Sequence, residues 1–215
     1  MDVALAINRR YAAKSFDPKK KMSGETMEVI LSALQNCPSS VNIQPWHFIV
    51  ADTQSGKRRV AKATENFPFN TPRVMDASLV VVFASRIIAD ERFLDAILAK
   101  EAQDGRYAKP EFKQNVKLIR QRFLGIHRAA GDEAEWLARQ VYLNIGFVLM
   151  AAAALGADAV PLEGVDLSVL DKEFGLADKG YRALAAVAFG YRKNDDFNAK
   201  LPKSRLAREV VFSKA

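Results

Sequence analysis

The longest apolar stretch of the chain lies near its middle. From Val141 to Leu155 only Asn144 interrupts residues that are apolar or glycine. An amphipathic helix at a protein surface keeps one polar face, whereas this pattern leaves no face for water. Acidic residues from Asp132 onward and a glycine at Gly156 mark the two ends. We therefore predict a long central helix from Asp132 to Leu155 that is buried on every side.

Three environments can bury such a helix: a membrane, the core of its own chain, or a second copy of the chain. A membrane span needs about 20 consecutive apolar residues, but this run is shorter and is closely flanked by Arg139 and Asp158. A second copy buries the helix without requiring a larger single core. We therefore predict a homodimer with this helix at its interface, and no membrane span.

The rest of the pattern alternates helices with buried strands. The runs Leu79 to Ala84 and Leu184 to Phe189 are apolar without alternation, which is typical of strands buried on both faces. The sheet is therefore expected to carry helices on both sides. After Ser23, a residue suited to an N-cap, apolar residues recur at helical spacing. Further helices are predicted over residues 2–10, 55–65, 89–100, 110–128 and 167–174, and a strand over 47–51.

Two shorter segments carry weaker patterns. Prolines are expected to hold residues 67–73 out of both helix and strand. Residues 210–212, with the sequence Val-Val-Phe, have strand character and are expected to extend a sheet edge of this chain or of a partner. Basic residues surround a narrow apolar stripe in the predicted helix 110–128, which favours a lid-like helix packed on the domain.

Composition limits the class of protein. The 215 residues are 49% hydrophobic and contain no linker-like segment, so we predict one domain over residues 1–215. Cys37 is the single cysteine and excludes an internal disulfide. Because no apolar signal segment follows Met1, a cytoplasmic protein is the simplest expectation.

The net charge of +7 is compatible with a nucleic acid, an anionic surface or an anionic small molecule. The basic residues are spread along the chain, and no zinc-finger spacing or aromatic-basic RNA-binding motif is present. Nucleic-acid binding is therefore not expected. His47 and His127 lie far apart in the sequence without a ligand cluster, so no metal site is expected either.

The usual nucleotide motifs are also missing. The chain has neither a G-x-G-x-x-G turn nor a G-x-x-x-x-G-K-[ST] loop. A bound phosphate needs several donors, and Arg10, Lys203 and Arg205 could supply them together. Polar loops at residues 38–44, 70–73 and 161–164 offer further hydrogen-bonding groups for a flat polar ligand.

Five segments, taken together and in this order, resemble the FMN-dependent nitroreductase family. They are Arg10–Asp17, Pro38–Trp46, Gln140–Asn144, Pro161–Gly164 and Leu201–Arg205. The resemblance covers nearly the whole chain and accounts for the missing glycine motif, because this family holds FMN without a dinucleotide-binding turn. It implies an α+β domain with a mainly antiparallel mixed sheet, an obligate homodimer with two FMN sites at the interface, and a C-terminal strand that extends onto the partner.

The resemblance also implies roles for individual residues. Arg10, Lys203 and Arg205 hold the flavin phosphate, with Tyr11 and Ala12 beside them. Lys14, Asn70 and Arg73 lie at the pyrimidine end of the ring, and Pro161, Glu163 and Gly164 approach the ring near N5 and O4. The partner chain contributes Pro38, Ser39, Ser40, Asn42 and Gln140. Lys14, Arg73 and Glu163 are the expected catalytic residues, and the expected substrate pocket consists of Ser40, Val41, Phe67, Phe69 and Phe123.

The implied activity is an alternating two-electron reduction. NAD(P)H reduces the FMN and leaves, and then a nitroaromatic or quinone takes the hydride in the same pocket. Fixed cations at the pyrimidine end stabilise the negative charge of the reduced ring. Reduction of a dihydropteridine or an enone, and flavin binding without turnover, are the alternatives.

Three positions depart from the family pattern. Ala12 stands where a hydroxyl is usual, and the lost hydrogen bond, worth about 0.5–1.5 kcal/mol, predicts weaker FMN retention. Arg73 stands where the relatives have lysine, and the two cations differ in geometry. Val41 replaces threonine and makes the substrate pocket more apolar.

Overall fold

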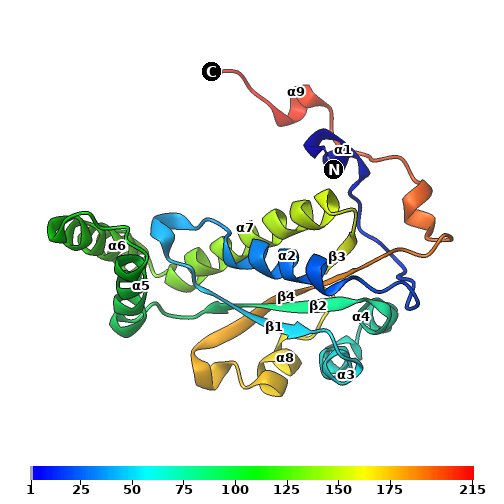
Figure 1. The fold of residues 1–215 in the computed structure, drawn as a ribbon, viewed down its shortest axis with the longest axis horizontal. Helices are drawn as coiled ribbons and strands as arrows, with labels where there is room; N and C mark the ends of the chain where they lie inside the picture. The colour runs from blue at the N-terminus through cyan, green and yellow to red at the C-terminus, as the bar shows by residue number, and fades with distance from the viewer. Residues whose placement is uncertain (1) are drawn as a thin grey trace.

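A four-stranded antiparallel sheet forms the centre of the computed structural model, which describes residues 2–215 (Figure 1). Its order is β1-β2-β4-β3, so β1 and β3 are the edge strands. The strands are β1 (Trp46–Ala51), β2 (Leu79–Arg86), β3 (Asp158–Leu162) and β4 (Tyr181–Gly190). The antiparallel pairings agree with the prediction. A parallel contact occurs only at an isolated bridge between Ala12 and Ala159, as far as the described residues go.

Strand β3 was predicted only as a polar loop from residue 161 onward. It lies at the edge of the sheet and pairs with β4 from Asp158 to Leu162. Pro161 lacks a backbone N–H, which is tolerated on an edge strand. The sequence pattern did not reveal β3 because the strand is short and contains a proline.

Helices cover both faces of the sheet, as predicted. On one face, Leu79, Val81 and Phe83 of β2 pack against α2 (Gly24–Gln35) and α7 (Glu133–Ala154). On the other face, Val80 and Val82 face α3 (Gln54–Ala61), α4 (Thr71–Asp76) and α8 (Leu167–Phe174). Figure 1 shows these two layers on opposite sides of the strands. The remaining helices are α1 (Val3–Arg9), α5 (Glu91–Gln103), α6 (Pro110–Ala130) and α9 (Arg208–Val211).

The central helix α7 is only partly buried within one chain. Val141, Ile145 and Val148 pack on the sheet. By contrast, Leu143 is 51% exposed and Phe147 is 43% exposed. The core of its own chain therefore does not bury this helix on every side. By length and composition α7 also passes as a membrane span, a test that the core helix of a soluble protein meets as well.

Two local predictions were wrong. Residues 68–73 are helical: Pro68 begins a 3-10 helix (Pro68–Asn70), and Pro72 lies in the first turn of α4. Proline is tolerated there since the first N–H groups of a helix have no partner within the helix. Residues 210–212 do not form a strand. They belong to α9 and its C-cap, where Phe212 N–H donates to the carbonyl of Arg208, because no strand of the described chain lies alongside to pair with them.

Candidate functional site

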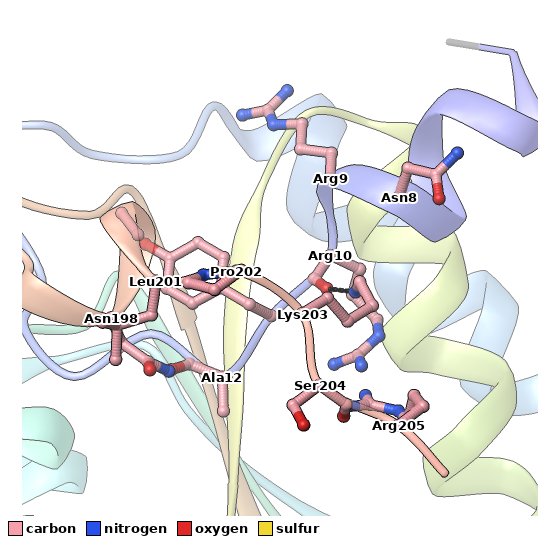
Figure 2. A pocket seen from close by; sticks show the side chains of 12 residues that line it. Asn8, Arg9, Arg10, Ala12, Asn198, Leu201, Pro202, Lys203, Ser204 and Arg205 are labelled. Atoms are coloured by element: carbon pink, nitrogen blue, oxygen red, sulfur yellow. Dashed lines mark hydrogen bonds between the residues drawn. The ribbon is translucent and has the colours of Figure 1, made fainter. Parts of the chain in front are cut away.

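A basic pocket lies between the end of α1 and the C-terminal tail. It has a volume of about 410 Å³ and is lined by Arg10, Lys203 and Arg205. Figure 2 shows the side chains of Arg10 and Arg205 next to each other, with that of Arg9 turned away from them. Among the described residues that line this pocket, four are cationic and none is acidic. Tertiary structure thus brings Arg10 next to Lys203 and Arg205, which lie almost 200 residues later in the sequence.

The cations of this pocket repel one another. Partial burial lowers the pKa of Lys203, and the charges of Arg10 and Arg205 lower it further. The Lys203 ammonium donates a hydrogen bond to the backbone carbonyl of Arg10, which ties the tail to the segment after α1. A bound anion would relieve this repulsion, so the pocket is suited to a phosphate group.

Asp196 connects this pocket to the next part of the site. Its carboxylate is buried and accepts hydrogen bonds from the backbone N–H groups of Lys14 at 2.7 Å and Ser15 at 3.2 Å. The same side chain accepts from the N–H of Asn198 at 2.9 Å. The Asn198 side chain in turn donates to the carbonyl of Ala12 at 2.8 Å. Segment 12–15 is therefore held against the tail that carries Lys203 and Arg205.

A chain of hydrogen bonds then runs from Lys14 to Gly164. Arg73 Nε donates to the carbonyl of Lys14 at 3.4 Å, and its Nη1 donates to Asn70 Oδ1 at 2.5 Å. Asn70 Nδ2 donates to the carbonyl of Gly164 at 2.8 Å. Burial lowers the pKa of Arg73, and the charge of Asp196 opposes this shift. The predicted residues of the ring end, which come from three separate segments, thus form one connected group.

Aromatic and acidic side chains surround this group. Phe67 and Phe69 meet edge to face with ring centroids 6.4 Å apart, and the Arg73 guanidinium lies 5.5 Å from the centre of the Phe69 ring. Glu163 accepts a hydrogen bond from the hydroxyl of Tyr142 at 3.1 Å. Pro161 is exposed at the sheet edge. These residues and the basic pocket make up the first half of the site, which we call the α1 half.

The other predicted residues form a second group, the loop half, which consists of residues 38–44 and Gln140. Gln140 Oε1 accepts a hydrogen bond from the N–H of Ser40 at 2.9 Å. Ser39 Oγ accepts from the N–H of Gln44 at 3.0 Å. Asn42 donates to Glu101 at 2.7 Å. Phe123 of α6, 42% exposed, is the predicted substrate residue on the neighbouring helix, which packs against the loop.

The loop half and the basic pocket lie toward opposite ends of α7 in one chain, whereas Glu163 of the α1 half reaches Tyr142 on the same helix. Gln140 anchors the loop half near the start of the helix. At its other end, Arg9 Nη2 donates to the carbonyl of Gly156 at 2.9 Å and so places the basic pocket there. These two positions are 16 residues apart, which corresponds to about 24 Å of helix. One chain therefore does not assemble the complete predicted set at one place.

The nitroreductase family model matches residues 7–191, a span that includes the loop half and the part of the α1 half that precedes the C-terminal tail. The chain belongs to the nitroreductase family.

Similar proteins agree with this assignment. The chain is 47% identical to the oxygen-insensitive NAD(P)H nitroreductase of Salmonella typhimurium, with 99% of each chain covered. The enzyme of the same name from Enterobacter cloacae is 44% identical, again with 99% of each chain covered. A protein of Exiguobacterium sibiricum solved in complex with FMN superposes with a TM-score of 0.83 at 23% identity, covering 100% of this chain and 98% of that chain.

Sequence reasoning missed several residues of this candidate site. Asp196 and Glu101 were not singled out, Asn198 was placed only in an irregular tail, and Tyr142 was interpreted as part of the apolar run. Arg120 was interpreted as one of the basic residues beside the apolar stripe of helix 110–128, yet Arg120 and Glu101 are both buried. The spacing of these residues in the sequence gives no signal, because each bonds to a group that the fold brings close, such as the Lys14 N–H for Asp196 and the Val41 carbonyl for Arg120.

Proposed function

We propose that the protein is an FMN-dependent NAD(P)H nitroreductase that reduces nitroaromatic compounds and quinones in two-electron steps. The observation that carries this proposal is the basic pocket joined through Asp196 to the group of Lys14, Asn70 and Arg73. The near full-length similarity to the enteric nitroreductases supports the same activity. The unit that acts is a single FMN-binding domain over residues 1–215.

The residues fit the cofactor at both of its ends. Arg10, Lys203 and Arg205 present mutually repelling cations to one space, which is suited to the dianionic phosphate of FMN. At the other end, Asn70 supplies a carboxamide and Lys14 and Arg73 supply positive charge. Glycine at position 164 lets the Asn70 carboxamide approach this closely, because a β-carbon there would lie 2.8 Å from Asn70 Nδ2.

The complete site is proposed to require two copies of the chain. The loop half and the basic pocket lie about 24 Å apart along α7, and the exposed side of this helix carries Tyr142, Leu143 and Phe147. If two such helices pack antiparallel about a twofold axis, the loop half of one chain meets the α1 half of the other. A homodimer thus buries the apolar face and assembles two identical sites.

Bound FMN supplies the two-electron carrier that takes a hydride from NAD(P)H and delivers it to the oxidant. Lys14 and Arg73 stabilise negative charge at the pyrimidine end of the ring. Phe67 and Phe69, with Val41 and Phe123 of the partner copy, make an apolar slot for a flat substrate. A single slot implies that NAD(P)H leaves before the oxidant enters. The protein is proposed to act in the cytoplasm, where this reductant is available.

The test uses purified protein. It is expected to be yellow, to release FMN on denaturation, and to oxidise NADH or NADPH when a nitroaromatic or a quinone is added, at the same rate in air and under nitrogen. A preparation that binds FMN but accepts no hydride from either nicotinamide would indicate a binding module instead. A panel of nitroaromatics, quinones, enones and a dihydropteridine separates the reductase alternatives. Protein that is colourless and cannot be reconstituted with FMN would refute the proposal.

A further inference from the structure

The loop half has a strained backbone. Val41, Asn42 and Gln44 have φ angles of 46°, 53° and 45°, in the left-handed region that favours glycine. For a β-branched residue such as Val41 this conformation is an outlier. Such strain persists only where the surrounding structure enforces it. Some contact must therefore hold this loop in place.

The buried ion pair of Arg120 and Glu101 forms hydrogen bonds with two of the strained residues. Arg120 Nε of α6 donates to the carbonyl oxygen of Val41 at 3.0 Å. Its Nη2 donates to Glu101 Oε1 of α5 at 2.8 Å, and the same oxygen accepts from Asn42 Nδ2 at 2.7 Å. The hydroxyl of Tyr107 donates to the other oxygen, Oε2. One charge pair thus holds the backbone of Val41 and the side chain of Asn42.

The pair is deeply buried, since Arg120 is 1% exposed and Glu101 is 4% exposed. A buried ion pair contributes little net stability compared with apolar residues of the same size, because both charges lose their hydration. Its hydrogen bonds, however, have fixed directions. A role in holding geometry therefore accounts for this pair better than a role in overall stability.

We propose that Arg120, oriented by Glu101, is a positioning residue that holds Val41 and Asn42 in their left-handed conformation and so presents Ser39, Ser40 and Asn42 to FMN. This inference rests on the proposed function, because it assigns these loop residues to the cofactor site. Arg120 itself acts only through the loop. The hydrogen bond from Arg120 to the Val41 carbonyl also fixes the backbone of Val41, which is a residue of the predicted substrate pocket.

The first test measures FMN affinity and loop protection. Arg120→Met keeps most of the side-chain volume but removes both hydrogen bonds, and it is expected to raise the dissociation constant for FMN roughly tenfold through release of the strained loop. Amide exchange in FMN-free protein is expected to accelerate at Ser40, Asn42 and Gln44, whose N–H groups are bonded within this half, while the core of α7 stays protected. Arg120→Lys serves as a second variant if the methionine protein does not fold, with an intermediate effect expected.

The second test separates positioning from general stability. In the Arg120→Met background, Val41→Gly is expected to restore much of the FMN affinity, because glycine adopts positive φ without penalty. Val41→Ala removes nearly as much of the side chain as Val41→Gly but keeps the penalty for positive φ. It is therefore expected to restore none of the FMN affinity.

Two outcomes would overturn the inference. One is an unchanged dissociation constant and unchanged loop exchange in Arg120→Met. The other is equal rescue by glycine and alanine. If the unmodified protein itself binds no FMN, the proposed function fails, and this result is distinct from a failure of the positioning role.

Discussion

Asn70 and Gly164 are in such close contact that a side chain at position 164 would have to displace the Asn70 carboxamide. Asn70 Nδ2 donates to the Gly164 carbonyl at 2.8 Å, and a β-carbon on Gly164 would lie 2.8 Å from the same nitrogen. Because Asn70 also accepts a hydrogen bond from Arg73, a shift of its carboxamide would disturb the guanidinium as well.

Gly164→Ala is therefore expected to weaken FMN binding roughly tenfold. The added methyl group displaces the Asn70 carboxamide, whose hydrogen bond contributes about 1 kcal/mol, and this shift also disturbs Arg73. Fluorescence titration of the protein with FMN measures this. Gly125→Ala is the matched control, because a β-carbon at that exposed helical position meets no atom within 4 Å. It should leave FMN binding unchanged and slightly raise the melting temperature. Wild-type affinity in Gly164→Ala would show that Asn70 can move freely.

Lys14 is held by its backbone N–H, which donates to Asp196, so truncation of its side chain leaves this anchor in place. Lys14→Ala is expected to lower the rate of flavin reduction by NADH or NADPH more than it lowers FMN affinity. The reason is that the Lys14 ammonium is proposed to stabilise the negative charge that accumulates at the pyrimidine end of the ring during reduction. Stopped-flow absorbance gives the rate and titration gives the affinity. Equal losses in both would mean that Lys14 only anchors the cofactor.

Arg205→Ala should show the reverse pattern, with faster FMN dissociation and a nearly unchanged reduction rate in the FMN-loaded enzyme. The reason is that Arg205 lines the basic pocket, which is suited to the phosphate and lies at the far end from the ring group. Arg208→Ala, three residues further along the tail, is the control and should match wild type. A loss of reduction rate at full FMN occupancy in Arg205→Ala would place this residue near the ring instead.

Ala12 lines the basic pocket, and its carbonyl is already bonded to Asn198. A hydroxyl at this position can therefore reach a phosphate without disturbing the backbone. Ala12→Ser is expected to slow FMN release roughly fivefold, in line with about 1 kcal/mol for one added hydrogen bond. Retention of FMN during dialysis, followed by its absorbance, tests this. Unchanged retention would indicate that the hydroxyl does not face the phosphate.

The exposed face of α7 predicts an obligate dimer. Phe147→Lys places a charge in the middle of this apolar face and is expected to yield monomers that do not retain FMN, because neither half of the site is complete alone. Sedimentation velocity gives the mass. Val50→Lys on the edge strand β1 is an equally exposed control that should remain dimeric. A monomer that keeps its FMN would refute the shared site.

The lowered pKa of Glu101 predicts how the free energy of unfolding depends on pH. Burial raises its pKa, but hydrogen bonds from Tyr107, Asn42 and Arg120 outweigh burial, and the pKa is lowered overall. Ionised Glu101 therefore stabilises the folded protein above the unfolded pKa of about 4.3, and this contribution is lost as the pH falls through the lower folded value.

Urea unfolding between roughly pH 3 and 7 should show that Glu101→Gln is less stable than wild type at neutral pH, because Arg120 is left buried without its counter-charge. The difference between the two proteins should shrink toward acid pH. Glu65→Gln, at an exposed carboxylate, is the control. A constant difference across the pH range would mean that the ionisation of Glu101 does not contribute.

The elements with a strong local pattern were predictable. The continuous apolar runs of β2 and β4 and the helical stripe of α2 specify their own local structure, because the order of apolar and polar residues along one segment shows which of its faces are buried. The helices at residues 68–73 and the edge strand β3 were not predictable, since proline is compatible with the first turn of a helix and with a sheet edge. The tail at residues 210–212 shows the opposite error, because strand propensity has no effect without a neighbouring strand to pair with.

The candidate site divides in the same way. The sequence by itself determined the list of candidate ligand residues, through the resemblance of the motif segments 10–17, 38–46 and 201–205 to the nitroreductase family. Only the tertiary structure decided that Asp196 and Arg120 hold those segments and that the loop half and the basic pocket lie toward opposite ends of α7. The physical reason is that a buried charge acts on whichever backbone groups the fold brings within hydrogen-bonding distance, and this proximity is not encoded in the spacing of residues along the chain.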